Sequence, residues 1–141
     1  MTRSLGLDIG DRRIGVALSD PEGILASPSK IITYEDDTTA IEAISDIVEK
    51  QQVKQIVVGL PRSMDGSLGK QAEKVKAFVE KLSSRIAVPL IFRDERLTTV
   101  SARHLMQEVK KKKTRGKTRD DAIAAAIILQ GYLDEARRPS F

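Results

Sequence analysis

The stretch "LGLDIGDRRIGVALSD", residues 5–20, has the alternation of a β-hairpin around a short turn at residues 11–13. Bulky apolar side chains stand at every second position: Leu5, Leu7, Ile9, Ile14, Val16 and Leu18. The positions between them are small, with one exception, the carboxylate of Asp8. The stretch therefore predicts two antiparallel strands with one bulky face and one bare face, and it places Asp8 on the bare face.

Strand and helix patterns continue along the rest of the chain. Strands are predicted around residues 24–33, at 54–61 and at 88–93, and helices at 38–50, from about 68 to 82, at 98–109 and at 120–136. Thr39 and Glu42 have the spacing of a capping box at the first helix, and Ser67 can cap the second. The order predicts an α/β fold with a mixed five-stranded sheet, an antiparallel three-strand meander followed by parallel strands, and helices on both faces.

Composition sets limits on the class of protein. The 141 residues contain no repeat and no dividing linker, so residues 1–141 are predicted to form a single domain. Cysteine is absent, which excludes disulfides and thiolate metal sites and favours a cytoplasmic location. Neither a signal-peptide pattern nor an apolar run of membrane-spanning length is present, so no membrane partner is expected.

The basic charge of the chain is concentrated in one segment. Residues 110–119 carry seven Lys and Arg residues and no acid, although the net charge of the whole chain is only +4. This segment favours a polyanionic partner such as nucleic acid, although a run of lysines is also common in solvated loops. With three Phe, two Tyr and no Trp, the chain is a poor candidate for a base-stacking platform.

Three acids stand next to predicted apolar elements, where burying a charged side chain costs folding free energy. They are Asp8 in the first strand, Glu95 just after the strand at 88–93, and Asp121 at the start of an apolar helix. Carboxylates brought together repel one another, and Mg²⁺ or Mn²⁺ would relieve that repulsion. Two such ions, about 3.5–4 Å apart, support phosphodiester hydrolysis. Taken singly, each acid has a structural alternative as a turn cap, an ion-pair partner or a helix cap.

Two other features have competing interpretations. In "GLPRSMDGS" (59–67), Gly59 and Pro61 can simply end a strand, or Arg62, Ser63 and backbone N–H groups can hold a phosphate near the acids. His104, the only histidine, lies among apolar neighbours in the predicted helix 98–109 and is expected to be structural.

Four stretches in order resemble the YqgF (RuvX) family of pre-16S rRNA nucleases, which are also described as Holliday-junction-resolvase-like. They are residues 7–20, 56–72, 94–102 and 120–133, and together they span almost the whole chain. The resemblance implies an RNase H-like fold and a metal-dependent nuclease whose catalytic, metal-binding acids are Asp8, Glu95 and Asp121. Arg13 matches an arginine common in the family. Asp11 departs from the family pattern, because many relatives have threonine there.

The resemblance implies an endonuclease that cuts structured RNA, in particular the ends of the 16S ribosomal RNA precursor, with two Mg²⁺ or Mn²⁺ ions. The residues expected to contact nucleic acid are Arg13, Arg62, Lys110, Lys111, Lys112, Lys113, Arg115 and Lys117. A resolvase of four-way DNA junctions with the same chemistry is the nearest alternative. A non-catalytic RNA-binding module and a phosphotransferase of the actin-like superfamily are less favoured, and either a monomer or a homodimer is expected.

Overall fold

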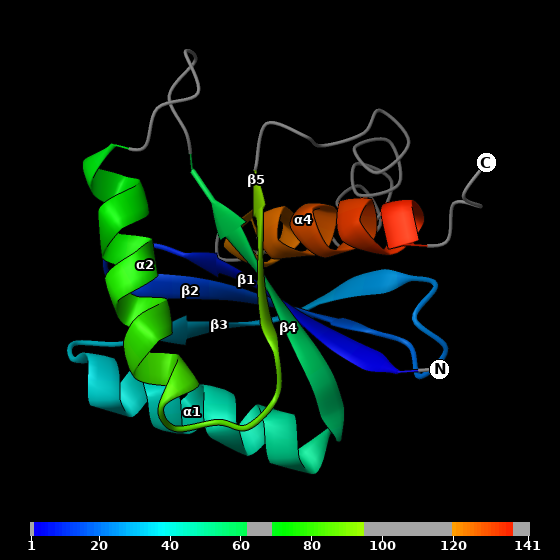
Figure 1. Ribbon diagram of the computed structural model, residues 1–141, viewed down its shortest axis with the longest axis horizontal. Coiled ribbons are helices and arrows are strands. Elements are labelled where there is room, and N and C mark those ends of the chain that lie inside the picture. Colours follow the sequence, from blue (N-terminus) through cyan, green and yellow to red (C-terminus); the bar gives the residue numbers. More distant parts are fainter. Residues whose placement is uncertain (1, 62–68, 95–119, 137–141) are drawn as a thin grey trace.

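A computed structural model describes residues 2–61, 69–94 and 120–136, with the backbone alone at residues 120 and 121 (Figure 1). Five strands and three helices lie in these ranges. The strands are β1 (Arg3–Ile9), β2 (Arg13–Ser19), β3 (Ala26–Thr33), β4 (Val53–Leu60) and β5 (Leu90–Asp94). The helices are α1 (Asp37–Lys50), α2 (Lys70–Ser83) and α4 (Asp120–Ala136). The predicted helix at 98–109, with His104, lies outside the described residues.

The five strands form one mixed sheet in the order β3-β2-β1-β4-β5. β1 pairs antiparallel with β2 and parallel with β4, and β4 pairs parallel with β5. The meander β1-β2-β3 is followed by parallel strands, so the predicted α/β sheet is confirmed. β3 is an edge strand, where a bulge opposite Val16 and Ala17 accommodates Pro28 without interrupting the strand.

The bulky face of the hairpin belongs to the larger of the two apolar cores that the described residues form. Leu5, Leu7, Ile14 and Val16 are fully buried there against apolar residues of α1 and α2, such as Ile44. Helices α1 and α2 cover this face of the sheet, whereas α4 crosses the other face (Figure 1). Helices therefore lie on both faces, as the sequence pattern predicts.

The bare face of the hairpin receives α4 at very short range. A Cβ atom built on Gly6 would lie 2.8 Å from the Leu129 Cβ and 2.9 Å from the Ala125 carbonyl oxygen. Ala17, Ala125 and Leu129 form the second core on this side. Small residues on both surfaces thus let the helix axis come close to the sheet.

Two helix starts differ from the sequence expectation. Helix α1 is capped by Asp36, whose carboxylate accepts hydrogen bonds from the Thr39 N–H and hydroxyl, both at 2.8 Å. These hydrogen bonds lower the pKa of Asp36. The prediction of Thr39 as the cap is wrong, because the helix begins at Asp37 and the Asp36 carboxylate accepts from the N–H of Thr39, which lies inside the first turn. Helix α2 begins at Lys70 with Gly69 as its N-cap, and Ser67 lies outside the described residues.

Candidate active site

Asp8 lies near the end of β1, the central strand, on the face of the sheet that carries α4. It stands opposite Gly15 of β2 and two residues after Gly6, against which α4 packs. Its side chain is half-buried. The sequence prediction that Asp8 occupies a face stripped of large neighbours is therefore confirmed.

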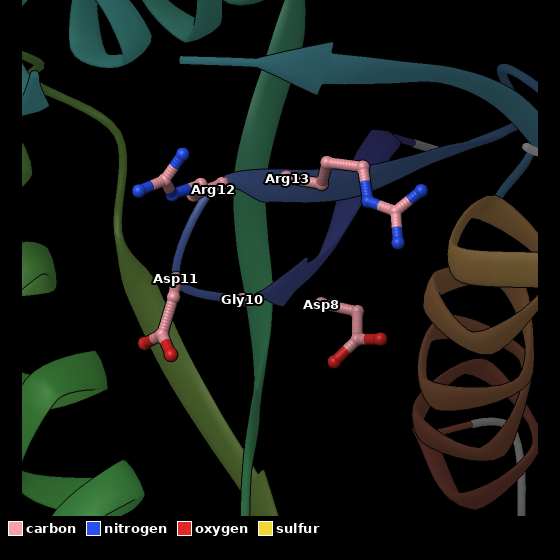
Figure 2. A pocket seen from close by; sticks show the side chains of 5 residues that line it. All are labelled: Asp8, Gly10, Asp11, Arg12 and Arg13. Atoms are coloured by element: carbon pink, nitrogen blue, oxygen red, sulfur yellow. The ribbon is translucent and has the colours of Figure 1, made fainter. Parts of the chain in front are cut away.

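A cavity of about 500 Å³ opens beside Asp8 at the turn between β1 and β2. It is lined by Asp8, Gly10, Asp11, Arg12 and Arg13. Figure 2 shows that the side chains of Asp8 and Arg13 extend toward the side of α4, whereas those of Asp11 and Arg12 extend toward the side of α2. One carboxylate and one guanidinium thus share the α4 side of the turn.

Asp11 is directed away from this carboxylate toward α2. Its carboxylate lies 3.4 Å from the Lys74 ammonium, and both side chains are 64% exposed. A pair this exposed contributes little to stability. The negative charge at Asp11 therefore has a lysine beside it on the far side of the turn.

Parallel pairing brings the ends of several strands to one edge of the sheet. Leu7 of β1 pairs with Val58 of β4, and Leu60 of β4 pairs with Asp94 of β5. The carboxyl ends of the three parallel strands β1, β4 and β5 therefore lie at the same end of the sheet. Asp8 lies at that end, on the central strand. Glu95, the next residue after β5, lies outside the described residues.

Asp121 falls in the first turn of α4, a helix that packs on the same face as Asp8. Its side chain is not described, so the predicted cluster of three acids stays a prediction. No group of three or more metal-ligating side chains occurs within residues 2–61, 69–94 and 122–136. Arg62 and the predicted nucleic-acid contacts at 110–117 also lie outside the described ranges.

The donor chemistry of the site fits a hard divalent cation. Asp8 supplies carboxylate oxygens, the ligand type that Mg²⁺ and Mn²⁺ prefer, and the cavity beside it is large enough for hydrated ions. Gly15, the residue opposite Asp8 on β2, places no side chain beside this carboxylate.

Polar contacts from both sides fix the position of α4, and sequence reasoning missed them. The Arg93 guanidinium of β5 is buried and donates a 2.7 Å hydrogen bond to the Glu135 carboxylate. It also lies so close to Gly131 that a Cβ there would come within 2.8 Å of it. On the opposite side of the sheet, the Ala26 N–H of edge strand β3 donates a 2.8 Å hydrogen bond to the side-chain amide oxygen of Gln130. An arginine inside the apolar strand 90–94 was the available sequence signal.

The fold is that of RNase H-like Holliday junction resolvases. RuvC of Thermus thermophilus bound to a Holliday junction substrate superimposes with a TM-score of 0.69, 12% identity and full coverage of both chains. The fowlpox virus resolvase in complex with Holliday junction DNA gives a TM-score of 0.61, with 10% identity over 96% of this chain and 99% of that one. At these identities the likeness defines the fold alone.

The chain belongs to the RuvX family, described as Holliday junction resolvase, whose profile matches residues 2–135. A relative from Dehalococcoides mccartyi is 51% identical over 134 residues, covering 94% of this chain and 98% of its own. One from Roseiflexus sp. is 47% identical over 135 residues and 96% of each chain. Both carry the name "Putative pre-16S rRNA nuclease". In the part of the chain that the structure describes, no helix has the length and apolarity to cross a membrane.

Proposed function

We propose that this protein is a metal-dependent endonuclease that hydrolyses phosphodiester bonds of the 16S ribosomal RNA precursor. The observation that carries the proposal is the half-buried carboxylate of Asp8 at the edge of the sheet, beside a cavity and under α4. The names of close relatives support the RNA substrate. With this substrate, the protein would act in the cytoplasm, in ribosome biogenesis.

The proposed metal ligands are Asp8, Glu95 and Asp121. Two bound Mg²⁺ or Mn²⁺ ions would supply Lewis-acid activation of water and neutralise charge developing on the phosphodiester. Asp8 offers its carboxylate from a rigid strand, which limits the reorganisation that cation binding requires. Arg13, whose side chain extends to the same side of the turn, is the proposed contact to a backbone phosphate of the nucleic acid.

The remaining proposed contacts orient the nucleic acid. Arg62 lies in the segment that follows β4, whose carboxyl end shares the edge with Asp8. The basic residues Lys110, Lys111, Lys112, Lys113, Arg115 and Lys117 precede α4 in the chain. Lysine and arginine at such positions hold phosphates without reading base sequence, which suits a substrate recognised by its structure.

A DNA junction is the second candidate substrate, favoured by the description of the family and by the fold shared with junction resolvases. Two symmetric cuts in a four-way junction need two active sites, so this alternative requires a dimer. The RNA alternative works with a monomer or a homodimer.

The experiment compares the two substrates directly. Purified full-length protein with Mg²⁺ or Mn²⁺ is expected to cut a precursor of 16S rRNA and to leave a four-way DNA junction of matched length intact. Chelation by EDTA is expected to abolish cleavage. Cleavage of the junction alone would overturn the RNA assignment, and cleavage in EDTA would overturn the metal chemistry.

A further inference from the structure

One aromatic residue, Tyr34, forms hydrogen bonds with the turn between β1 and β2. Tyr34, the first residue after β3, donates its phenolic O–H to the Gly10 carbonyl oxygen at 2.6 Å. Its backbone N–H donates to the Arg12 carbonyl oxygen at 3.0 Å. One residue thus contacts the turn between β1 and β2 at two points, on the side away from Asp8.

Tyr34 is itself fixed in place. It is only 8% exposed, and its ring packs against Phe78 of α2 with centroids 6.0 Å apart. It also lines a second cavity, of about 240 Å³, together with Asp11 and Asp37. Burial, followed by the charges of Asp37 and Asp11, raises the pKa of Tyr34. Like any tyrosine, it is protonated at neutral pH and can donate a hydrogen bond.

The turn needs such support because its first residue is glycine. The Gly10 N–H closes the turn on the Arg13 carbonyl at 2.9 Å, and a Cβ at this position would lie 2.9 Å from that same oxygen. Glycine meets this tight approach but leaves the backbone with more freedom than any other residue. The hydrogen bond from Tyr34 removes part of that freedom at the carbonyl of the same residue.

We propose that Tyr34 is a positioning residue for the cation and phosphate site. Through the carbonyls of Gly10 and Arg12, it holds the turn that separates the Asp8 carboxylate from the Arg13 guanidinium. Supporting contacts of this kind preorganise metal ligands and commonly change metal affinity when they are removed. The inference deepens the proposed function and rests on it.

Tyr34→Phe tests the inference, because it deletes one hydroxyl and retains the ring. Mn²⁺ binding is measured by titration of the metal-free full-length protein, and amide hydrogen exchange is followed over residues 9–13. The variant is expected to bind Mn²⁺ about tenfold more weakly, at the lower end of the effects of supporting-residue mutations. Exchange in the turn is expected to become faster.

Ile47→Val is the matched control. Ile47 lies in the same core cluster as Tyr34, but near the C-terminal end of α1, whereas Tyr34 precedes the N-terminal end of that helix. The loss of one methylene there lowers stability by about as much as the loss of one hydrogen bond. The control is expected to lower the melting temperature comparably while keeping wild-type Mn²⁺ affinity. Equal losses of Mn²⁺ affinity in both variants would reduce Tyr34 to a general structural role.

The experiment distinguishes failure of the positioning role of Tyr34 from failure of the proposed metal-dependent chemistry. Wild-type Mn²⁺ affinity in Tyr34→Phe would overturn the positioning role and leave the proposed nuclease chemistry standing. A wild-type protein that binds no Mn²⁺ would overturn the proposed metal chemistry, and the positioning role with it.

Discussion

At the scale of single residues, the central question is how the fold tolerates a carboxylate on an apolar sheet. Asp8 is half-buried at the end of its strand, next to a cavity and with Arg13 on the same side of the turn. A partly desolvated carboxylate is costly unless a positive charge is close. Arg13 extends to the same side of the turn, and divalent cations bound there would supply further positive charge.

Asp8→Asn is expected to reduce cleavage by about two orders of magnitude or more, because it removes a charged ligand and keeps the side-chain volume. A second readout is thermal denaturation with and without Mn²⁺. A ligand at one hundred times its dissociation constant stabilises the folded state by about 2.7 kcal/mol, and this stabilisation should be lost in the variant.

The matched control for that change is Asp46→Asn. Asp46 is an exposed acid on α1, on the opposite face of the sheet, and its substitution makes the same change of charge. It should retain both cleavage and stabilisation by Mn²⁺. Undiminished cleavage by Asp8→Asn would mean that this carboxylate is a structural turn residue.

At the scale of secondary-structure elements, the packing of α4 on the hairpin determines where Asp121 stands relative to Asp8. The contact is set by Gly6, where the helix backbone itself is within reach of a Cβ. The buried Arg93–Glu135 hydrogen bond ties the same helix to β5. The helix is thus located by one steric contact and by polar contacts on both sides.

Gly6→Ala is expected to destabilise the fold by about 1–3 kcal/mol, because the new methyl overlaps backbone and Cβ atoms that cannot rotate away. Reduced backbone freedom in the unfolded chain offsets part of this cost. Urea denaturation measures the change. Cleavage should fall as well, since α4 must move away from the sheet.

Gly69→Ala serves as the control for the loss of a glycine. No atom lies within 4 Å of a Cβ built there, and Gly69 is the N-cap of α2. Its cost should be about 1 kcal/mol or less, the difference between alanine and glycine at an N-cap. Equal losses in the two variants would show that the close approach of α4 has no energetic importance.

At the scale of the whole molecule, the two faces of the sheet have different tasks. One face holds the large apolar core under α1 and α2, and the other holds α4 and the candidate site (Figure 1). Charge is also unevenly distributed along the chain. Without the seven bases at 110–119, 17 Lys and Arg residues would face 20 acids, so we expect any attraction for nucleic acid to depend on that segment.

Replacing Lys110–Lys113 with alanine is expected to weaken RNA binding and to flatten its salt dependence. Each lost phosphate contact lowers the slope of log K against log salt by about 0.7–0.9. Binding titrations at several salt concentrations measure both effects. An unchanged slope would identify the segment as solvated surface.

A control of equal charge separates local contacts from net charge. Alanine at Lys30, Lys50, Lys54 and Lys76 removes the same number of positive charges from exposed positions elsewhere. This variant should keep a slope closer to that of the wild type. Equal slopes in the two quadruple variants would point to a general electrostatic attraction.

Local patterns were sufficient for the sheet and for its two faces. The alternation of side chains around Leu7 and Val16 depends only on strand geometry and therefore predicts the two faces. The alanines of α4 indicate a close contact between this helix and the sheet. Helix boundaries were less accessible, because Asp36 and Thr39 both have side chains that can cap a helix, and only the backbone path selects between them. The complete acid cluster remains a prediction from sequence.

The sequence by itself thus determined the succession of strands and helices along the chain, the bare face and the place of Asp8 on it, because periodicity and side-chain size act over a few neighbouring residues. Only the tertiary structure decided that Tyr34 supports the turn at Gly10 and that Arg93 meets Glu135. These partners are 24 and 42 positions apart in the chain. Whether such groups meet depends on strand register and on how closely helices approach the sheet, and packing sets both for the molecule as a whole.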